Sequence, residues 1–231
     1  GIGRLCEGAA VHRGGGVGGE GWIGLAHGGI LGTNGRADGS GYVSSGMNLF
    51  RHAEGVAVQT ASGPLVLRHI IGVGMNYAAH AIEQGKGVPT RPVLFTKNPL
   101  SASLDGDPIV IPIACQDKPQ VDFECELAVI IGERSKDVPR ERALDTVLGY
   151  VAASDVSARW WQKDGSGGQF YRGKSFDSFC PLGPRVVPAK EIPDPQALRL
   201  QTRVNGVTMQ DSSTADMIFD VATLIAEISR G

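Results

Sequence analysis

The segment Asp122-Phe-Glu-Cys-Glu-Leu-Ala-Val-Ile-Ile131 contains the most distinct strand pattern in the chain. Its last five residues are apolar throughout, which is typical of a strand buried on both faces, and we predict a strand over Phe123–Ile131. The acids at its start alternate with apolar residues, so on a strand Asp122, Glu124 and Glu126 share one face. Residues two apart on a strand are separated by about 6.6 Å, close enough for two carboxylates to converge on one ion.

Two interpretations of these acids stay open from the spacing alone. An acidic alternation is usually a solvated strand face, whereas the apolar continuation draws this strand into the core. Carboxylates that enter a core together repel one another unless they are protonated or bridged by a cation. A metal held only by carboxylate oxygens would be Mg²⁺, Mn²⁺ or Ca²⁺ rather than zinc.

A third oxygen donor is expected from another element, and Asp155 is the best candidate. It follows a predicted strand over Gly149–Ser154, at a strand-to-loop transition where functional groups often lie. Arg159 and Gln162 follow four and seven positions later, on one face of a helix if a helix begins there. The structural alternatives are a helix N-cap for Asp155 and a surface ion pair for Arg159.

Two further groups could take part in proton transfer or charge stabilisation. His80 and Glu83 are three positions apart, so on a helix the carboxylate would lie beside the imidazole and raise its basicity. The alternative for this pair is a solvated helix face. Lys174 lies in a polar turn after Gly173, where an isolated lysine is usually a surface residue.

The remaining patterns predict an α+β fold, because many strands alternate irregularly with few helices. The Asn205-Gly206 pair is typical of a type I′ hairpin turn. We expect further strands at Ile70–Val73, Val93–Thr96, Ile109–Ile113 and Leu198–Val204, and helices at Asn76–Gln84, Arg140–Val147 and Asp216–Ser229.

Composition divides the chain into two parts. Of its 33 glycines, 17 lie in residues 1–48, and such density leaves few side chains to bury. We therefore expect residues 1–68 to be a Gly-rich, poorly ordered or degenerate N-terminal extension, followed by a folded domain over residues 69–231.

Charge, hydropathy and cysteine spacing narrow the class of protein. A net charge of −2 offers no basic excess for nucleic acid, and no run approaches the ~18 apolar residues of a membrane span. We expect neither nucleic acid nor membrane as a partner. The four cysteines have no paired spacing, which suits a reducing compartment; we expect the cytoplasm, with the mitochondrion as the alternative.

Several short motifs follow one another over residues 69–231. They are Gly72–Tyr77 (GVGMNY) with His80 and Glu83, Pro92–Lys97 (PVLFTK), Val121–Val129 (VDFECELAV), Ser154–Arg159 (SDVSAR), Arg172–Asp177 (RGKSFD), Phe179–Pro184 (FCPLGP), Asn205-Gly206, Gln210-Asp211 and Met217–Asp220 (MIFD). In this order they resemble the fumarylacetoacetate hydrolase superfamily, the catalytic domain of acylpyruvases and related 2-oxo-acid enzymes.

The resemblance implies a mixed β-sheet roll and assigns roles to individual residues. Family members usually continue past the helix that ends near Ser229, so we expect a C-terminally incomplete domain that lacks its last strands. The implied roles are Mg²⁺ or Mn²⁺ binding by Glu124, Glu126 and Asp155, water activation by His80 with Glu83, stabilisation of developing negative charge by Lys174, and substrate binding by Arg159, Gln162 and Tyr77.

These roles describe a metal-dependent hydrolase that cleaves a C–C bond in an acylpyruvate-type 2,4-dioxo acid through a metal-stabilised enolate. We expect a small-molecule 2-oxo acid as substrate and a homodimer as the assembly. The alternatives are a 2-oxo-acid decarboxylase or tautomerase with the same enolate, or a truncated, non-catalytic family member. Trp160 stands where the family often has Asp, directly after Arg159.

Overall fold

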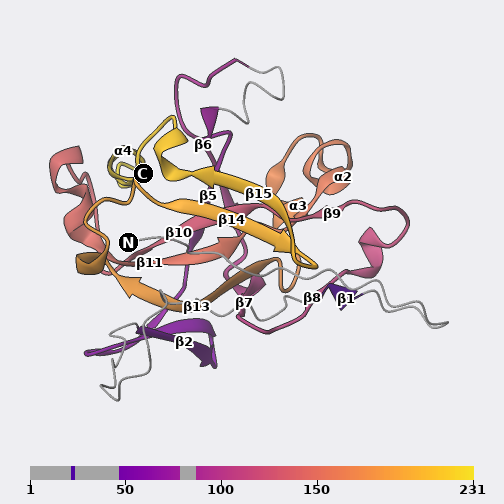
Figure 1. The fold of residues 1–231 in the computed structure, drawn as a ribbon, viewed down its shortest axis with the longest axis horizontal. Coiled ribbons are helices and arrows are strands. Elements are labelled where there is room, and N and C mark those ends of the chain that lie inside the picture. Colours follow the sequence, from indigo (N-terminus) through magenta and orange to yellow (C-terminus); the bar gives the residue numbers. More distant parts are fainter. Residues whose placement is uncertain (1–21, 24–46, 79–86) are drawn as a thin grey trace.

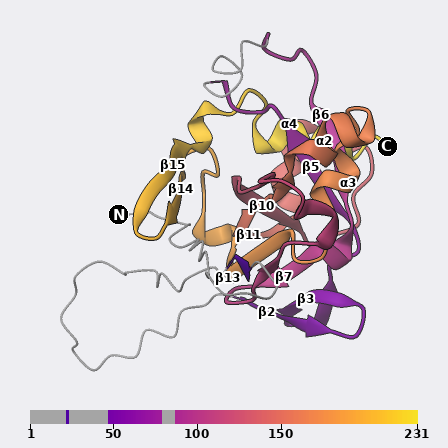
Figure 2. The same ribbon diagram turned by 90° about the vertical axis from the view of Figure 1, so that its right-hand side faces the viewer.

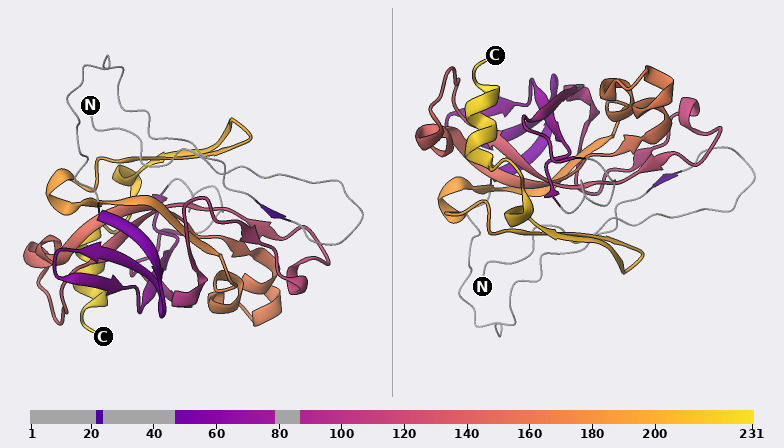
Figure 3. Two further views of the ribbon diagram at one scale, coloured as in Figure 1. Left: turned by 90° about the horizontal axis from the view of Figure 1, so that it is seen from below. Right: turned by 90° about the horizontal axis from the view of Figure 1, so that it is seen from above.

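A seven-stranded mixed sheet forms the centre of the computed structural model, which describes residues 22–23, 47–78 and 87–231 (Figure 1). Six strands follow the order β10-β11-β13-β2-β3-β4, every neighbouring pair antiparallel, and β7 adds to β13 in parallel. Their bounds are β2 (Met47–His52), β3 (Gly55–Thr60), β4 (Gly63–Val66), β7 (Ala102–Leu104), β10 (Cys125–Ile131), β11 (Val147–Ser154) and β13 (Cys180–Pro188). Figure 3 shows β11 and β13 curving across the molecule.

Four two-stranded sheets surround this centre. They pair β1 (Trp22–Ile23) with β8 (Ile109–Val110), β5 (Ile70–Gly74) with β6 (Val93–Lys97), β9 (Val121–Asp122) with β12 (Ser157–Ala158), and β14 (Arg199–Val204) with β15 (Val207–Ser213). Figure 2 shows β10 between the β14–β15 hairpin and the α2–α3 region.

The helices within the described ranges are short, and none is long and apolar enough to cross a membrane. The α-helices are α2 (Arg159–Gln162), α3 (Phe170–Lys174) and α4 (Val221–Ile228). The 3₁₀ helices are η1 (Pro99–Ser101), η2 (Ile113–Cys115), η3 (Arg140–Thr146), η4 (Asp164–Ser166), η5 (Ala189–Glu191) and η6 (Thr214–Asp216).

Apolar side chains pack on both faces of the sheet. One cluster joins Val147 and Tyr150 of β11 to Val221 and Ile225 of α4. The other cluster includes Val151 of β11 with residues of β3, β10 and β13. Because side chains alternate along a strand, Tyr150 and Val151 point to opposite faces of β11 and pack into two different apolar clusters. The mixed, strand-dominated α+β architecture confirms the predicted fold class.

The structure of residues 47–66 differs from the expectation that the folded domain begins at residue 69. Strands β2, β3 and β4 form an antiparallel meander within residues 47–66, and β2 pairs with β13 in the main sheet. Val56, Ala57 and Val58 are buried there. A poorly ordered extension up to residue 68 was therefore the wrong expectation for this meander, whose two glycines, Gly55 and Gly63, begin β3 and β4 directly after the turns.

Several predicted elements are confirmed with different bounds. The strand over Phe123–Ile131 begins only at Cys125, and Ile131 is 38% exposed, since β10 lies at the edge of the sheet in the described part of the chain. Burial on both faces was thus wrong for its end. The strand over Ile109–Ile113 is reduced to β8, because Pro112 leads into η2.

The C-terminal helix begins later than the predicted Asp216. Asp220 is its N-cap and accepts a hydrogen bond from the Thr223 N–H at 2.7 Å. Ile218 lies in a bend before the cap, and its N–H donates to the Asn76 carbonyl at 2.8 Å. The Asn205-Gly206 turn joins β14 to β15 with positive φ at both residues, as a type I′ turn requires. The predicted helix over Asn76–Gln84 falls largely on residues outside the described ranges.

Gly149 offers a test of the packing between β11 and β13. A Cβ at this position would overlap the Val187 carbonyl oxygen, which is backbone and cannot rotate away. We expect Gly149→Ala to lower the free energy of unfolding by about 1–3 kcal/mol, measured by urea denaturation. Gly87→Ala is the matched control, since a Cβ there meets open space and should change stability by less than about 0.5 kcal/mol. Equal effects of both substitutions would contradict the close packing described here.

Candidate active site

The acids at the start of β10 lie at an interruption of regular structure. Strand β9 ends at Asp122 and β10 begins at Cys125, so Phe123 and Glu124 lie between the two strands. The Glu124 carbonyl accepts a hydrogen bond from the Asp155 N–H at 2.9 Å, which joins the ends of β10 and β11. The prediction that Asp122, Glu124 and Glu126 share one face of a continuous strand was therefore wrong, although Glu124 and Asp155 do lie together.

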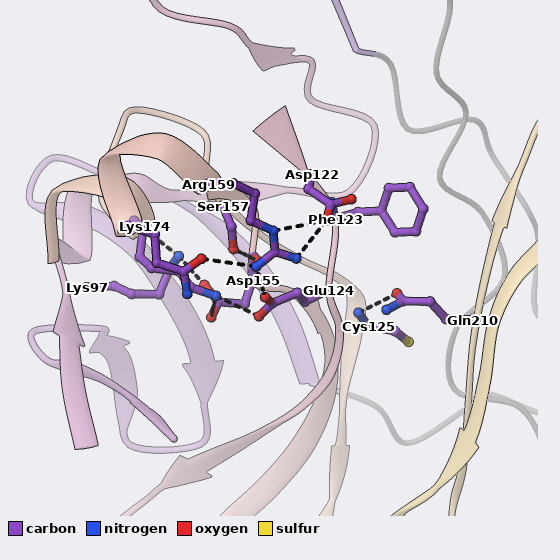
Figure 4. A network of polar contacts seen from close by, with 11 residues as sticks. Lys97, Asp122, Phe123, Glu124, Cys125, Asp155, Ser157, Arg159, Lys174 and Gln210 are labelled. Carbon is purple, nitrogen blue, oxygen red and sulfur yellow. Dashed lines mark hydrogen bonds and ion pairs between the residues drawn. The ribbon is translucent and has the colours of Figure 1, made fainter. Parts of the chain in front are cut away.

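Lys174 connects these two acids (Figure 4). Its side chain is 2% exposed, and its Nζ lies 2.6 Å from Glu124 Oε2 and 2.6 Å from Asp155 Oδ2. Burial of an ammonium group is costly unless charged partners surround it. Lys174 is thus a buried, doubly paired cation and not the surface residue that its local sequence suggests.

A close approach of two helices lets Lys174 reach this position. Gly173 precedes it on α3, and a Cβ at Gly173 would lie 2.5 Å from the Gln162 backbone nitrogen. Because glycine has no Cβ, it permits this close contact between α3 and α2. The glycine that made Lys174 look like a loop residue in the sequence therefore brings it into the cluster.

Lys97 is a second buried lysine in the cluster, and no role was predicted for it. It ends β6, its side chain is 3% exposed, and its Nζ lies 2.5 Å from Asp155 Oδ1. The same Nζ also donates to the Lys174 carbonyl. The signal in the sequence was a lysine at the end of the apolar run Val93–Lys97, but only the pairing of β5 with β6 shows which way it points.

Arg159 lies on the other side of Glu124. Its guanidinium donates to Asp122 Oδ2 at 2.7 and 3.0 Å, to Gln162 Oε1 at 3.1 Å, and to Glu124. Burial lowers the pKa of Arg159, but Glu124 and Asp122 outweigh burial and hold it above its ordinary value. The predicted association of Arg159 with Gln162 is thus present on α2, and Asp122 orients Arg159 instead of joining the other acids.

The two glutamates differ in their electrostatic environment. Burial raises the pKa of Glu124, but the charges and hydrogen bonds of Lys174 and Arg159 outweigh burial and hold the pKa below its usual value. Burial also raises the pKa of Glu126, and there the nearby charges of Glu124 and Asp155 raise it further, well above 4.5. Among the described residues no hydrogen bond reaches the Glu126 carboxylate.

The remaining predicted site residues are only partly placed. Tyr77 forms an isolated backbone bridge with Met217, next to the clamp in which Asn76 exchanges two side-chain hydrogen bonds with the Phe219 backbone at 2.9 and 3.0 Å. His80 and Glu83 lie outside the described residues. One contact network therefore joins Glu124, Asp155, Lys174, Arg159 and Gln162. Glu126 lies near this network, and the charges of Glu124 and Asp155 raise its pKa.

Comparison with known proteins assigns this chain to a family. A mixed β-roll with a buried cluster of acids and bases defines an enzyme-type scaffold, and residues 69–231 match the family model of the fumarylacetoacetate hydrolase C-terminal domain. The chain belongs to the fumarylacetoacetate hydrolase family. This confirms the resemblance found in the sequence.

Individual relatives differ in the reactions their names give. The chain is 45% identical over 161 residues to a mitochondrial oxaloacetate tautomerase of Xenopus laevis, covering 70% of this chain and 50% of the relative. It resembles the fumarylacetoacetate hydrolase of Exiguobacterium antarcticum (TM-score 0.65, 33% identity, 80% of this chain and 81% of that chain). It also resembles a 5-carboxymethyl-2-hydroxymuconate delta-isomerase of Mycobacterium smegmatis (TM-score 0.64, 34% identity, 79% and 76%). The chain spans about half the length of the curated relatives it matches.

The environment of the Glu126 carboxyl leads to a prediction about thermal stability, which is measured in EDTA so that no divalent cation is bound. An acid whose folded pKa is raised destabilises the fold once pH exceeds its unfolded value, 4.5, because ionisation then favours the unfolded chain. We expect Glu126→Gln to have a higher Tm than the wild type at pH 7.5, with the difference shrinking as pH falls toward 4.5. Scanning calorimetry across this pH range measures it. A Glu126→Gln chain that is less stable than the wild type at every pH would contradict the crowded environment of this carboxyl.

Proposed function

We propose that this cluster binds a divalent cation and a small 2-oxo acid, and that the chain hydrolyses a C–C bond in an acylpyruvate-type 2,4-dioxo acid. The observation that carries the proposal is one network in which Lys97, Lys174 and Arg159 surround Glu124 and Asp155. Such concentrations of buried charge are costly for stability and are typical of functional sites.

The donor set agrees with the proposed metal in its chemistry. No group of three His, Cys, Asp or Glu side chains within the described ranges has the geometry of a metal site, and Lys174 lies between Glu124 and Asp155. All candidate ligands are nevertheless carboxylates, and Glu126 lies near the charges of Glu124 and Asp155 without an ion pair to a basic side chain among the described residues. We propose that Glu124, Glu126 and Asp155 hold Mg²⁺, with Mn²⁺ or Ca²⁺ as alternatives.

The bound cation would supply Lewis-acid polarisation of the 2-oxo group. The basic residues of the chain have separate roles. Arg159 presents a planar guanidinium that Gln162 and Asp122 hold in place, a geometry that suits a substrate carboxylate. Lys174 and Lys97 place two ammonium groups in a buried environment, where they would stabilise negative charge that develops on a substrate oxygen.

Water activation completes the hydrolase proposal. We assign it to His80 with Glu83 on the strength of the family resemblance, and Tyr77 to substrate binding on the same ground. We also propose a homodimer, and a cytoplasmic location with the mitochondrion as the alternative. The name of the Xenopus laevis relative places that protein in the mitochondrion.

A second candidate function is tautomerisation of a 2-oxo acid, for which the name of the 45% identical relative argues. Tautomerisation moves a proton from C3 to the 2-oxo oxygen and back, so it needs charge stabilisation but no attacking water. Decarboxylation of a 2-oxo acid requires the same stabilisation of an enolate. Lys97, Lys174 and Arg159 could serve all three reactions, so the reaction itself must be measured.

Assays of the purified chain on acylpyruvate and on oxaloacetate, each with Mg²⁺ and with EDTA, separate these reactions. We expect Mg²⁺-dependent cleavage of acylpyruvate that falls by about 100-fold or more in Glu126→Gln and in Arg159→Gln. Arg142→Gln is the matched control, because Arg142 pairs with Asp145 on the surface. Enol–keto conversion of oxaloacetate without acylpyruvate cleavage would favour the tautomerase, and equal rates in Mg²⁺ and EDTA would overturn the metal proposal.

A further inference from the structure

The peptide group between Glu124 and Cys125 is held from both of its sides. Its carbonyl accepts from the Asp155 N–H at 2.9 Å, and its N–H donates to the Gln210 side-chain oxygen at 2.9 Å. The C=O and N–H of a trans peptide point in opposite directions. The first bond therefore faces β11, and the second faces away from the sheet toward β15 (Figure 4).

This second bond compensates for a missing strand neighbour. In the described part of the chain β10 lies at the edge of the main sheet, so the N–H groups on its outer side have no strand to pair with. The Gln210 amide supplies the acceptor at Cys125, the residue between the two glutamates of the cluster. A side chain from the hairpin thus replaces a ladder hydrogen bond at the point where β10 enters the site.

Gln210 is also unusual within its own strand. Its neighbours Val207, Thr208, Met209, Asp211 and Ser212 are exposed, whereas Gln210 is half-buried. The hairpin is braced separately, since Asp211 accepts from Arg199 and Gln201 of β14. The bond from Gln210 to Cys125 is therefore not needed to hold β14 and β15 together, and it connects the hairpin to the candidate site.

We propose that Gln210 is a positioning residue that fixes the direction of the Glu124 side chain by anchoring the peptide between Glu124 and Cys125. This proposal rests on the proposed function for its catalytic consequence, but not for the anchoring itself. Phe123 and Glu124 lie outside regular strands, so rotation of this peptide group is limited by the two hydrogen bonds rather than by a continuous ladder. Loss of one bond frees the rotation that aims the Glu124 carboxylate, whereas Glu126 is held by the pairing of β10 with β11.

Amide hydrogen exchange measured by NMR in EDTA tests the anchor directly. In the wild type the Cys125 amide should be protected although it faces the sheet edge. Gln210→Met keeps the shape of the side chain without the amide oxygen, and we expect Cys125 exchange to become about tenfold faster. Gln210→Glu retains an acceptor oxygen and should restore the protection. Met209→Ala, at an exposed neighbour that is 54% accessible, is the control that should leave it unchanged.

Kinetics test the consequence for the site. In Gln210→Met we expect the Mg²⁺ concentration for half-maximal turnover to rise by about tenfold, as when an outer partner of a metal ligand is removed. An unprotected Cys125 amide in the wild type, or equal exchange in Gln210→Met and Met209→Ala, would overturn the anchor. Changed exchange with an unchanged Mg²⁺ dependence would overturn the positioning role. If the wild type turns over neither substrate, the proposed function fails while the exchange data still decide the anchor.

Discussion

The ion pairs of the buried Lys174 ammonium are the constraint on which the rest of the site depends. One Nζ lies 2.6 Å from both Glu124, directly before β10, and Asp155, directly after β11, and Lys97 approaches Asp155 from the end of β6. Removing one member of such a buried group leaves an uncompensated charge, which costs far more than the group contributes as a whole. The close contact of α3 with α2 at Gly173, the end of β6 and the junction of β10 with β11 must therefore form together.

The distribution of charge within the cluster separates structural from chemical roles. Glu124 and Asp155 have basic partners, and Asp122 has Arg159. Burial and the charges of Glu124 and Asp155 raise the pKa of Glu126, and the charge of Lys174 offsets them only in part; among the described residues no basic side chain forms an ion pair with Glu126. A fold selected for stability alone would not retain such an acid, so the environment of Glu126 agrees with the ligand-binding role proposed for the charged network around Glu124 and Asp155.

Patterns with a local physical cause could be predicted from the sequence. The period of two in Leu198–Val204 with its Asn-Gly turn gave a hairpin, and the apolar run after Glu126 gave a strand, because both depend on neighbouring residues. Asp155 was predicted as the residue that follows a strand, but the helix expected to begin there begins only at Arg159, so Asp155 does not share a helix with Arg159 and Gln162. Lys97 was missed because its role depends on the pairing of β5 with β6. Strands β2–β4 were missed because the expected domain began only at residue 69, and these short strands join the fold through the pairing of β2 with β13.

The charged cluster lies at a sheet edge, which explains why β10 begins later than predicted and why the three acids do not share one face of a strand. A continuous strand through Asp122–Glu126 would have directed three acids to one face and left its outer N–H groups without acceptors. The interruption at Phe123–Glu124 instead turns Asp122 toward Arg159, leaves Glu124 to Lys174, and exposes one N–H that Gln210 binds. The Gln210 side chain thus replaces a ladder hydrogen bond at this edge, and the directions of Asp122 and Glu124 come to depend on partners distant in the sequence.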